Sequence, residues 1–206
     1  MPAAYLTYSM AMAQRAIAAL VLVVSVAVVL EAAKIKVQKD PKIDVATFKT
    51  WIWHPTAPGD VKVWISADSK SEPVKKQYEP ILMQAVEEQI AARGYTPASA
   101  PPADFVLTYR LLIAMNDSSQ YMGQFLPTNA NWGIPPFSPQ TQSFSYYPQG
   151  TLIIDAEMPN SGPIIWRGIA EAKVELENSD EKRTARLRAV IKELMGKFPK
   201  KAVKKG

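Results

Sequence analysis

Asp155 and Arg167 are two residues whose types and spacing predict a specific interaction. Residues 151–157 and 164–176 are predicted to form two strands, the second from its alternation of side chains between two faces, and residues 158–163 form a Pro, Asn and Gly-rich turn between them. Counting outward from this turn places Asp155 opposite Arg167 on the face that points away from Trp166. The sequence therefore predicts a structural cross-strand ion pair that contributes about 0.2–1 kcal/mol.

Catalytic chemistry has little support in the sequence. Asp155 and Glu157 could in principle act as a carboxylate pair in glycoside hydrolysis, but two acids two residues apart on a strand are typical of a solvated face. The chain has no Cys and a single histidine, His54, which excludes a thiol nucleophile, a disulfide framework and a multi-histidine metal site. A phosphate-binding glycine loop, a Gly-x-Ser-x-Gly motif and a His-Glu-x-x-His motif are all absent. We predict no catalytic residue, no metal and no cofactor.

An uncharged segment, residues 118–154, has the most distinctive composition in the chain. It contains five Pro, seven aromatic residues and many Asn, Ser and Gln, but no charged side chain. Rigid aromatic side chains beside small polar ones are typical of binding surfaces, so a protein or a neutral glycan is one expected partner. The alternative is a loop that folds over the open face of the sheet and completes its core. The candidate binding residues are Tyr121, Phe125, Trp132, Phe137, Tyr146 and Tyr147.

The elements that would position these residues form an α+β domain over residues 34–199. We expect a mostly antiparallel sheet with two helices packed on one face, in the order β-β-α-β-β-β-α. The strand over 164–176 should be half-buried, with Trp166 in the core and Arg167 on a solvated face. The expected strands are residues 48–53, 61–65, 105–113, 151–157 and 164–176, and the expected helices run from Pro80 to about Gly94 and from Asn178 to Pro199.

The N-terminal segment, residues 1–33, reads as a signal peptide or an N-terminal anchor. Its apolar run, residues 16–30, would span roughly 22 Å as a helix, which is less than the roughly 30 Å of a membrane core. An arginine before the run and small residues after it are typical of secretory signals. We therefore expect an exported protein, and the sequence leaves open whether and where the segment is cleaved.

Basic residues concentrate in the C-terminal tail, residues 200–206. The last ten residues contain five Lys and no acid, whereas the rest of the chain has 19 basic and 19 acidic residues. Charge in a tail instead of on a folded face argues against specific nucleic-acid binding. A frayed, solvated end is the simpler interpretation, and the alternative is a weak contact with an anionic surface through Lys200, Lys201, Lys204 and Lys205.

Five groups of short motifs follow one another through residues 36–200. They are Asp40-Pro41-x-x-Asp44 with Phe48-Lys49-Thr50-Trp51-x-Trp53; Ala91-Ala92-Arg93-Gly94-Tyr95; Ala103-Asp104-Phe105-Val106-Leu107; Gly150-Thr151-Leu152-Ile153-Ile154-Asp155 with Ile165-Trp166-Arg167-Gly168-x-Ala170; and Lys197-Phe198-Pro199. In this order they resemble a family of bacterial envelope lipoproteins that is classified as domain of unknown function 4136. The resemblance implies a periplasmic or membrane-associated protein of a Gram-negative bacterium, and it implies no known activity. Members carry a lipid-modified cysteine where this chain has Ala33, so we expect no anchor through cysteine.

Together these features predict an exported cell-envelope domain that binds a protein or glycan partner, or supports an envelope assembly, without catalysing a reaction. Two alternatives stay open. One is an enzyme on envelope glycans with acidic residues that the sequence does not identify, and the other is an anionic-surface binder that acts through the Lys-rich tail.

Overall fold

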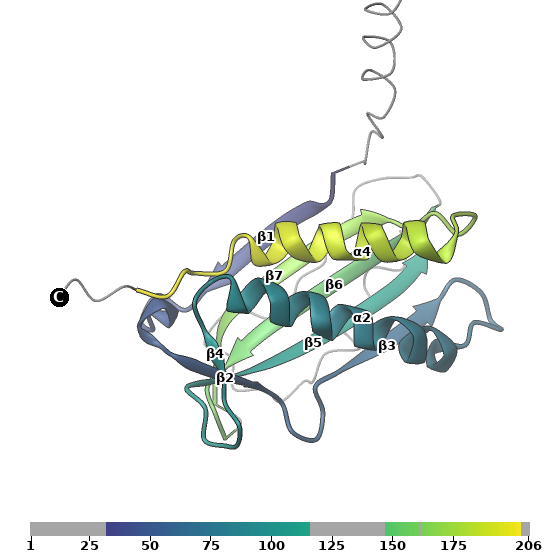
Figure 1. The fold of residues 1–206 in the computed structure, drawn as a ribbon. Coiled ribbons are helices and arrows are strands. Elements are labelled where there is room, and N and C mark those ends of the chain that lie inside the picture. The colour runs from purple at the N-terminus through teal and green to yellow at the C-terminus, as the bar shows by residue number, and fades with distance from the viewer. Residues whose placement is uncertain (1–31, 116–146, 161, 203–206) are drawn as a thin grey trace, which may run out of the picture. The chain divides into compact units, whose positions relative to one another are not determined.

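The structure is a computed structural model, and it describes residues 32–115, 147–160 and 162–202 (Figure 1). Of the expected signal or anchor segment, only residues 32 and 33 lie within the described residues. The candidate binding residues Tyr121, Phe125, Trp132, Phe137 and Tyr146 lie outside them, as do Lys204 and Lys205 of the tail.

Two helices lie on one face of a seven-stranded sheet, which confirms the expected α+β class (Figure 1). Apolar residues of both helices and of the strands beneath them form one core cluster. In chain order the elements are β1 (Lys34–Lys39), η1 (Val45–Thr47), β2 (Thr50–Trp53), β3 (Gly59–Trp64), α2 (Ser71–Ala91), β4 (Thr96–Pro97), β5 (Phe105–Met115), β6 (Pro148–Glu157), β7 (Ile164–Lys173) and α4 (Asp180–Met195).

The sheet is mixed, so the expectation of a mostly antiparallel sheet holds for only part of it. Its strand order is β1-β7-β6-β5-β2-β4. β3 is outside this order and pairs with a later part of β5 than β2 does. The neighbours β1–β7, β7–β6 and β6–β5 are antiparallel, whereas β2 and β3 run parallel to β5, and β4 runs parallel to β2. The parallel pairs follow from the connection, because a helix between two strands of one sheet is a crossover that returns the chain in the same direction.

Two strands were not expected, so the predicted order β-β-α-β-β-β-α is incomplete. β1 alternates lysines with Ile35 and Val37 and pairs with β7 at the edge of the sheet. Lysines on an edge strand discourage pairing with another chain, which accounts for the charged character of this strand. β4 has only two residues, too few for a periodic signal.

Both helices begin at positions other than the expected ones. α2 starts at Ser71, nine residues before Pro80, which lies inside the helix. The first half of α2 is rich in charged and polar residues, so its apolar periodicity becomes visible only beyond Pro80. α4 is capped by Ser179, whose hydroxyl accepts a hydrogen bond from the amide of Lys182, one residue later than the predicted start at Asn178.

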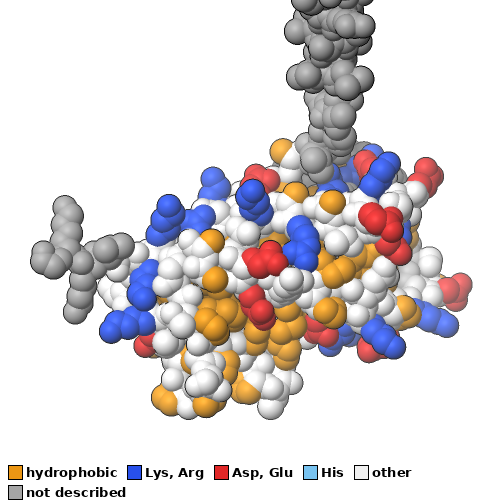
Figure 2. All heavy atoms as spheres, in the orientation of Figure 1, with side chains coloured by type: hydrophobic (Ala, Val, Ile, Leu, Met, Phe, Trp, Pro, Cys, Tyr) orange, Lys and Arg blue, Asp and Glu red, His pale blue; other side chains and the backbone are white. Residues whose placement is uncertain are grey.

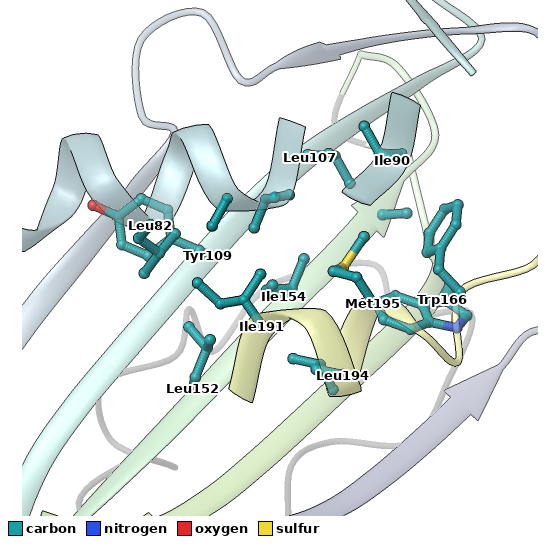
Figure 3. Close-up of a cluster of buried hydrophobic side chains, with 14 of the residues drawn as sticks. Leu82, Ile90, Leu107, Tyr109, Leu152, Ile154, Trp166, Ile191, Leu194 and Met195 are labelled. Carbon is teal, nitrogen blue, oxygen red and sulfur yellow. The ribbon is translucent and has the colours of Figure 1, made fainter. Parts of the chain in front are cut away.

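The main core lies between the helices and the sheet (Figure 3). Leu82 and Ile90 of α2 and Ile191 and Leu194 of α4 point toward the strands. Trp166 is completely buried at this interface, which confirms its predicted core position. The strand residues that complete the labelled cluster are Leu107, Tyr109, Leu152 and Ile154.

The central strands are buried on both faces, which corrects the prediction of a half-buried strand over residues 164–176. The first seven residues of β7 are all buried, and Arg167 is 0% exposed. The uncharged segment is also not a single loop, because its last seven residues, 148–154, lie in β6. The alternation of Arg167, Glu171 and Lys173 with Trp166, Gly168, Ala170 and Ala172 correctly separated the two faces of β7 but did not show that both are shielded from water.

Candidate functional site

Asp155 and Arg167 form the predicted ion pair, with tighter geometry than a surface pair has. They are direct partners in the β6–β7 register. Arg167 Nε donates to Asp155 Oδ1 and Arg167 Nη2 donates to Oδ2, each at 2.7 Å. The exposed fractions are 4% for Asp155 and 0% for Arg167. A buried bidentate pair of this kind joins the two strands and leaves the Asp155 carboxylate fully engaged.

Glu157 lies two residues further along β6 and accepts a 2.7 Å hydrogen bond from the hydroxyl of Thr108 on β5. Burial raises the pKa of this carboxyl above its usual value. A catalytic pairing of Asp155 and Glu157 finds no support here, because both oxygens of Asp155 are held by Arg167. The observed contacts of both acids join neighbouring strands.

Asp104, in the motif Ala103-Asp104-Phe105-Val106-Leu107, fixes the start of β2. Its carboxylate accepts hydrogen bonds from the amides of Lys49 and Thr50, each at 2.8 Å, and from the Thr50 hydroxyl at 2.9 Å. The bonds from the Thr50 and Lys49 amides hold the pKa of Asp104 below its usual value. Two motifs that are about fifty residues apart in the sequence therefore meet through one carboxylate.

Arg93 and Tyr95, in another motif, hold the C-terminal segment against the sheet. Arg93 Nη1 donates to the carbonyl of Phe198 at 3.0 Å, and Nη2 donates to the carbonyl of Gly196. The ring of Phe198 contacts two other aromatic rings edge-on. Its centroid lies 5.5 Å from the centroid of Tyr95 and 4.8 Å from that of Trp166. These motif residues act together as a structural cluster at one end of the helix–sheet interface.

The first part of the tail is also attached, which corrects the interpretation of a frayed end for residues 200–202. The amide of Lys201 donates to the carbonyl of Arg93 at 3.0 Å, and the amide of Ala202 donates to the carbonyl of Ala46 at 2.8 Å. Of the tail lysines, Lys200 and Lys201 lie among the described residues, and Lys200 is exposed.

An open pocket of about 130 Å³ lies at the other end of the interface, where β5 and β7 end and β6 begins. Its floor is the helix-facing side of these strands, where Gly150, Ala170 and Ala172 present little or no side chain. Its wall comes from α4, through Leu187 and Val190. The other lining residues are Tyr78, Leu111, Ile113, Leu152, Lys173, Val174, Glu175, Asn178, Arg183 and Arg186.

Small side chains explain why the pocket forms at this end. Along the helix-facing side of β7 the order is Trp166, Gly168, Ala170 and Ala172. The Trp166 ring lies over Gly168, since a Cβ built on that glycine would be 2.4 Å from the ring. Beyond this point the two alanines leave the space between strand and helix unfilled, and the interface opens to the surface.

Cationic groups outnumber carboxylates among the residues that line this pocket: Lys173, Arg183 and Arg186 against Glu175. Arg183 is engaged with the Asp180 carboxylate, with the hydroxyl of Tyr78 and with the carbonyl of Leu176. Figure 2 shows hydrophobic side chains reaching the surface among the charged groups on the helix side of the molecule. The pocket thus combines apolar walls with a net positive lining.

Tyr147 is the one predicted binding residue within the described part of the chain. It is partly buried, and the ammonium group of Lys173, which lines the pocket, lies 6.0 Å from its ring centroid. This distance is at the limit for a cation–π contact. Sequence reasoning missed the pocket itself, although the run of small residues on one face of β7 was a signal that could have indicated it.

Trp51, Trp53 and His54 have structural surroundings. Trp51 is in the core, and its ring meets that of Trp53 edge-on at 6.0 Å. The indole N–H of Trp53 donates to Glu87 at 2.9 Å. His54 Nδ1 accepts from the amide of Ala57 at 3.1 Å and so fixes a turn. No group of three or more His, Asp or Glu side chains within the described ranges is arranged to hold a metal ion.

The fold and these contacts define a small α+β domain with a mixed sheet and two helices on one face. An open apolar pocket lies between α4 and the sheet. The sequence model of the family described as domain of unknown function 4136 matches residues 35–200. The chain belongs to this family, as the motifs predicted. Comparison with curated proteins finds no match.

Solved structures that match this chain include a protein of the same family from Bacteroides thetaiotaomicron, with 17% identity, a TM-score of 0.41 and coverage of 77% of this chain and 91% of that one. A PDZ domain protein from Parabacteroides distasonis shares 13% identity with a TM-score of 0.47, and the match covers 83% of this chain but only 36% of that one. A minor lipoprotein from Acinetobacter baumannii shares 14% identity with a TM-score of 0.29, over 68% of this chain and 88% of the lipoprotein. Neither α2 nor α4 is long and apolar enough to cross a membrane.

Proposed function

We propose that this protein is an exported domain of the Gram-negative cell envelope and that it acts by binding, without catalysis, through the pocket between α4 and the ends of β5–β7. The observation that carries the proposal is the open pocket of about 130 Å³ on a domain whose motif residues are otherwise engaged in structural contacts. The apolar run at residues 16–30 supports export.

Binding fits the chemistry of the lining better than catalysis does. Glu175 is the one carboxylate among the residues that line the pocket, and it accepts a hydrogen bond from Asn178. General acid–base chemistry with two carboxylates therefore has no second partner within the pocket. Lys173, Arg183 and Arg186 give the lining residues a net positive charge.

The edges of the sheet are poorly suited to binding a partner strand. On β3 the outward amides of Val61 and Val63 donate to the side chains of Asp60 and Ser71, at 2.9 Å each. β1, at the opposite edge, carries Lys34, Lys36 and Lys39. Edge strands whose backbone donors are already hydrogen-bonded, or whose side chains are charged, resist pairing with a strand of another chain. The pocket is therefore the better candidate for a partner-binding site.

The partner presents an apolar group to this pocket. A neutral glycan, one of the two partners expected from the sequence, has hydroxyl groups that the largely apolar lining could not satisfy with hydrogen bonds. A protein side chain or a hydrocarbon chain matches the walls formed by Leu187, Val190 and Leu111. We therefore favour a partner that docks by burying apolar surface.

The experiment is photo-crosslinking in intact cells with a tagged full-length chain. Leu176 is 50% exposed and lies between the lining residues Glu175 and Asn178, so it is the position for the photoreactive residue. Trp64, which is 40% exposed on β3, is the matched control position. We expect recovery of the protein from the envelope fraction and adducts at position 176 that are missing at position 64. Recovery only from the cytosol, or equal adducts at both positions, would contradict the proposal.

A further inference from the structure

We propose that the end of the domain opposite the pocket docks on a membrane surface rich in anionic phospholipid. This surface, called the basic end below, consists of residues 39–46 and 196–202. It goes beyond the proposed function, because it is a second surface that would recognise its partner by charge. The position of the tail lysines, the charges around them and the apolar run before the domain support it.

Contacts within the fold bring the two segments of the basic end together. Lys39 is the partner of Trp166 in the β1–β7 register, so its side chain lies on the helix-facing side of the sheet. The Trp166 ring contacts that of Phe198, and the amide of Ala202 donates to the carbonyl of Ala46 at 2.8 Å. Figure 2 shows blue side chains gathered at the left end of the molecule, where Figure 1 places the last described residues. The first tail lysines are therefore part of a folded surface.

Positive charge exceeds negative charge at the basic end. It holds two acids, Asp40 and Asp44, and five lysines, which are Lys39, Lys42, Lys197, Lys200 and Lys201. All of these lysines except Lys201 are exposed, and none forms an ion pair with another described residue. The two carboxylates accept hydrogen bonds from the amides of Lys42 and Ala46. The ammonium groups are thus available to an external anion.

The end that carries the pocket has no such excess. Residues 173–186 run from the last residue of β7 into α4 and include several pocket-lining residues. They contain four acidic and four basic residues, so their formal charges cancel. A negatively charged surface therefore attracts the basic end more strongly than the pocket end. Docking in this orientation leaves the pocket directed away from the surface and open to its own partner.

A bilayer fits the basic end better than a nucleic acid does. Arg93, the arginine at this end, donates to the carbonyls of Gly196 and Phe198, which leaves lysines as the exposed cations. A lysine ammonium group attracts phosphate without requiring a fixed geometry. The rings of Tyr95 and Phe198 are buried and cannot stack on bases. The apolar run at residues 16–30 also favours a membrane, because one apolar signal combined with a basic patch is a stable means of membrane attachment.

The test uses the full-length chain with a fluorophore on one introduced cysteine, since the sequence contains none. Ala202→Cys labels the basic end, and Leu176→Cys, at a position that is 50% exposed, labels the pocket end. The vesicles are phosphatidylcholine with a nitroxide quencher on some head groups, with or without about 30% phosphatidylglycerol. Residues 16–30 can insert into either kind of vesicle, so quenching without phosphatidylglycerol is the baseline for both labels. We expect phosphatidylglycerol to increase quenching at position 202 more than at position 176, and high salt to remove this difference.

A triple variant tests the lysines themselves. Lys39→Gln, Lys42→Gln and Lys200→Gln together should weaken the phosphatidylglycerol-dependent part of binding about a hundredfold, since each lysine near an anionic surface contributes about fivefold. The three positions are exposed, so the fold should be retained. Arginine at all three positions should preserve binding, because it keeps the charge.

The matched control removes the same charge from other exposed positions. Lys70→Gln, Lys76→Gln and Lys182→Gln together lower the net charge by the same amount as the first triple variant. Their combined effect on phosphatidylglycerol-dependent binding should be less than about fivefold, because these lysines are away from the basic end.

Three outcomes would overturn the inference. Equal quenching at positions 202 and 176 with phosphatidylglycerol would contradict the orientation and requires no lysine substitution. Equal effects of the two triple variants would show that net charge alone attracts the protein. A DNA duplex of mixed sequence that binds more tightly than the phosphatidylglycerol vesicles at the same salt concentration would assign the basic end to nucleic acid. Photo-crosslinking at position 176 tests the pocket separately, so the proposed function can stand or fail without this second surface.

Discussion

Replacing Arg167 by alanine tests how the buried ion pair contributes to stability. The change removes both 2.7 Å hydrogen bonds to Asp155 and leaves a carboxylate that is only 4% exposed without this partner. Breaking one partner of a buried pair costs about 3–5 kcal/mol, far more than the roughly 0.2–1 kcal/mol of an exposed cross-strand pair. For a domain of this size such a loss lowers Tm by about 6–20 °C.

The assay is urea unfolding beside thermal melting, with Arg188→Ala as the matched control. Arg188 lies 3.3 Å from Glu88 on the helix surface, where the two side chains are 36% and 51% exposed, so its removal should cost less than about 1 kcal/mol. Replacing both Asp155 and Arg167 by leucine should recover most of the loss, because the uncompensated charge is then gone. If Arg167→Ala costs no more than Arg188→Ala, the pair is not shielded from water and the reasoning is wrong.

Three further changes test other parts of the fold. Trp166→Ala should cost about 3–5 kcal/mol in urea unfolding, because the side chain is completely buried against Phe198 and over Gly168. Burial raises the pKa of Glu157 in the folded state above the ordinary value of a glutamate, so its contribution to stability is fully present below that ordinary pKa and is lost as the pH rises through the folded-state pKa. Glu157→Gln should therefore flatten the decline of unfolding free energy with rising pH in that window, and an unchanged pH profile would contradict the assignment. Arg93→Ala removes the hydrogen bonds to the carbonyls of Phe198 and Gly196, and should speed hydrogen exchange of the Lys201 and Ala202 amides while α2 amides keep their protection.

The β6–β7 hairpin and its ion pair could be predicted from sequence because their signals are local. A recognisable turn fixes the register, and the register places Asp155 opposite Arg167. The burial of that pair could not be predicted in the same way. Alternation shows that two faces differ in polarity, but whether the polar face meets water depends on contacts with residues distant in the chain.

The errors in the other elements have equally specific causes. The parallel pairing of β3 with β5 was available from the predicted order of strand 61–65, helix and strand 105–113, but the expectation of a mostly antiparallel sheet did not take this crossover into account. β1 was missed although lysines alternate with apolar residues in it, because only two apolar residues, Ile35 and Val37, carry the pattern. The first turns of both helices are polar, so apolar periodicity alone does not locate their first residues. The start of α2 was expected nine residues too late, and the cap of α4 one residue too early.

The core and the proposed site lie at opposite ends of the interface between the helices and the sheet. The size of the side chains along β7 determines which end is filled and which is open. Where β7 carries Trp166, the ring covers Gly168 and meets Phe198, and the motif residues gather around it. Where β7 carries Ala170 and Ala172, the strand presents only methyl groups to the same helix, and the pocket opens there. A tryptophan at position 172 would extend the core and abolish the pocket. The motifs that carry the family resemblance include residues of both ends, since Gly150, Leu152 and Ala170 line the pocket. The open end is where differences in function are to be sought, because residues there can change in size without loosening the contacts of Arg93, Tyr95 and Asp104 that hold the domain together.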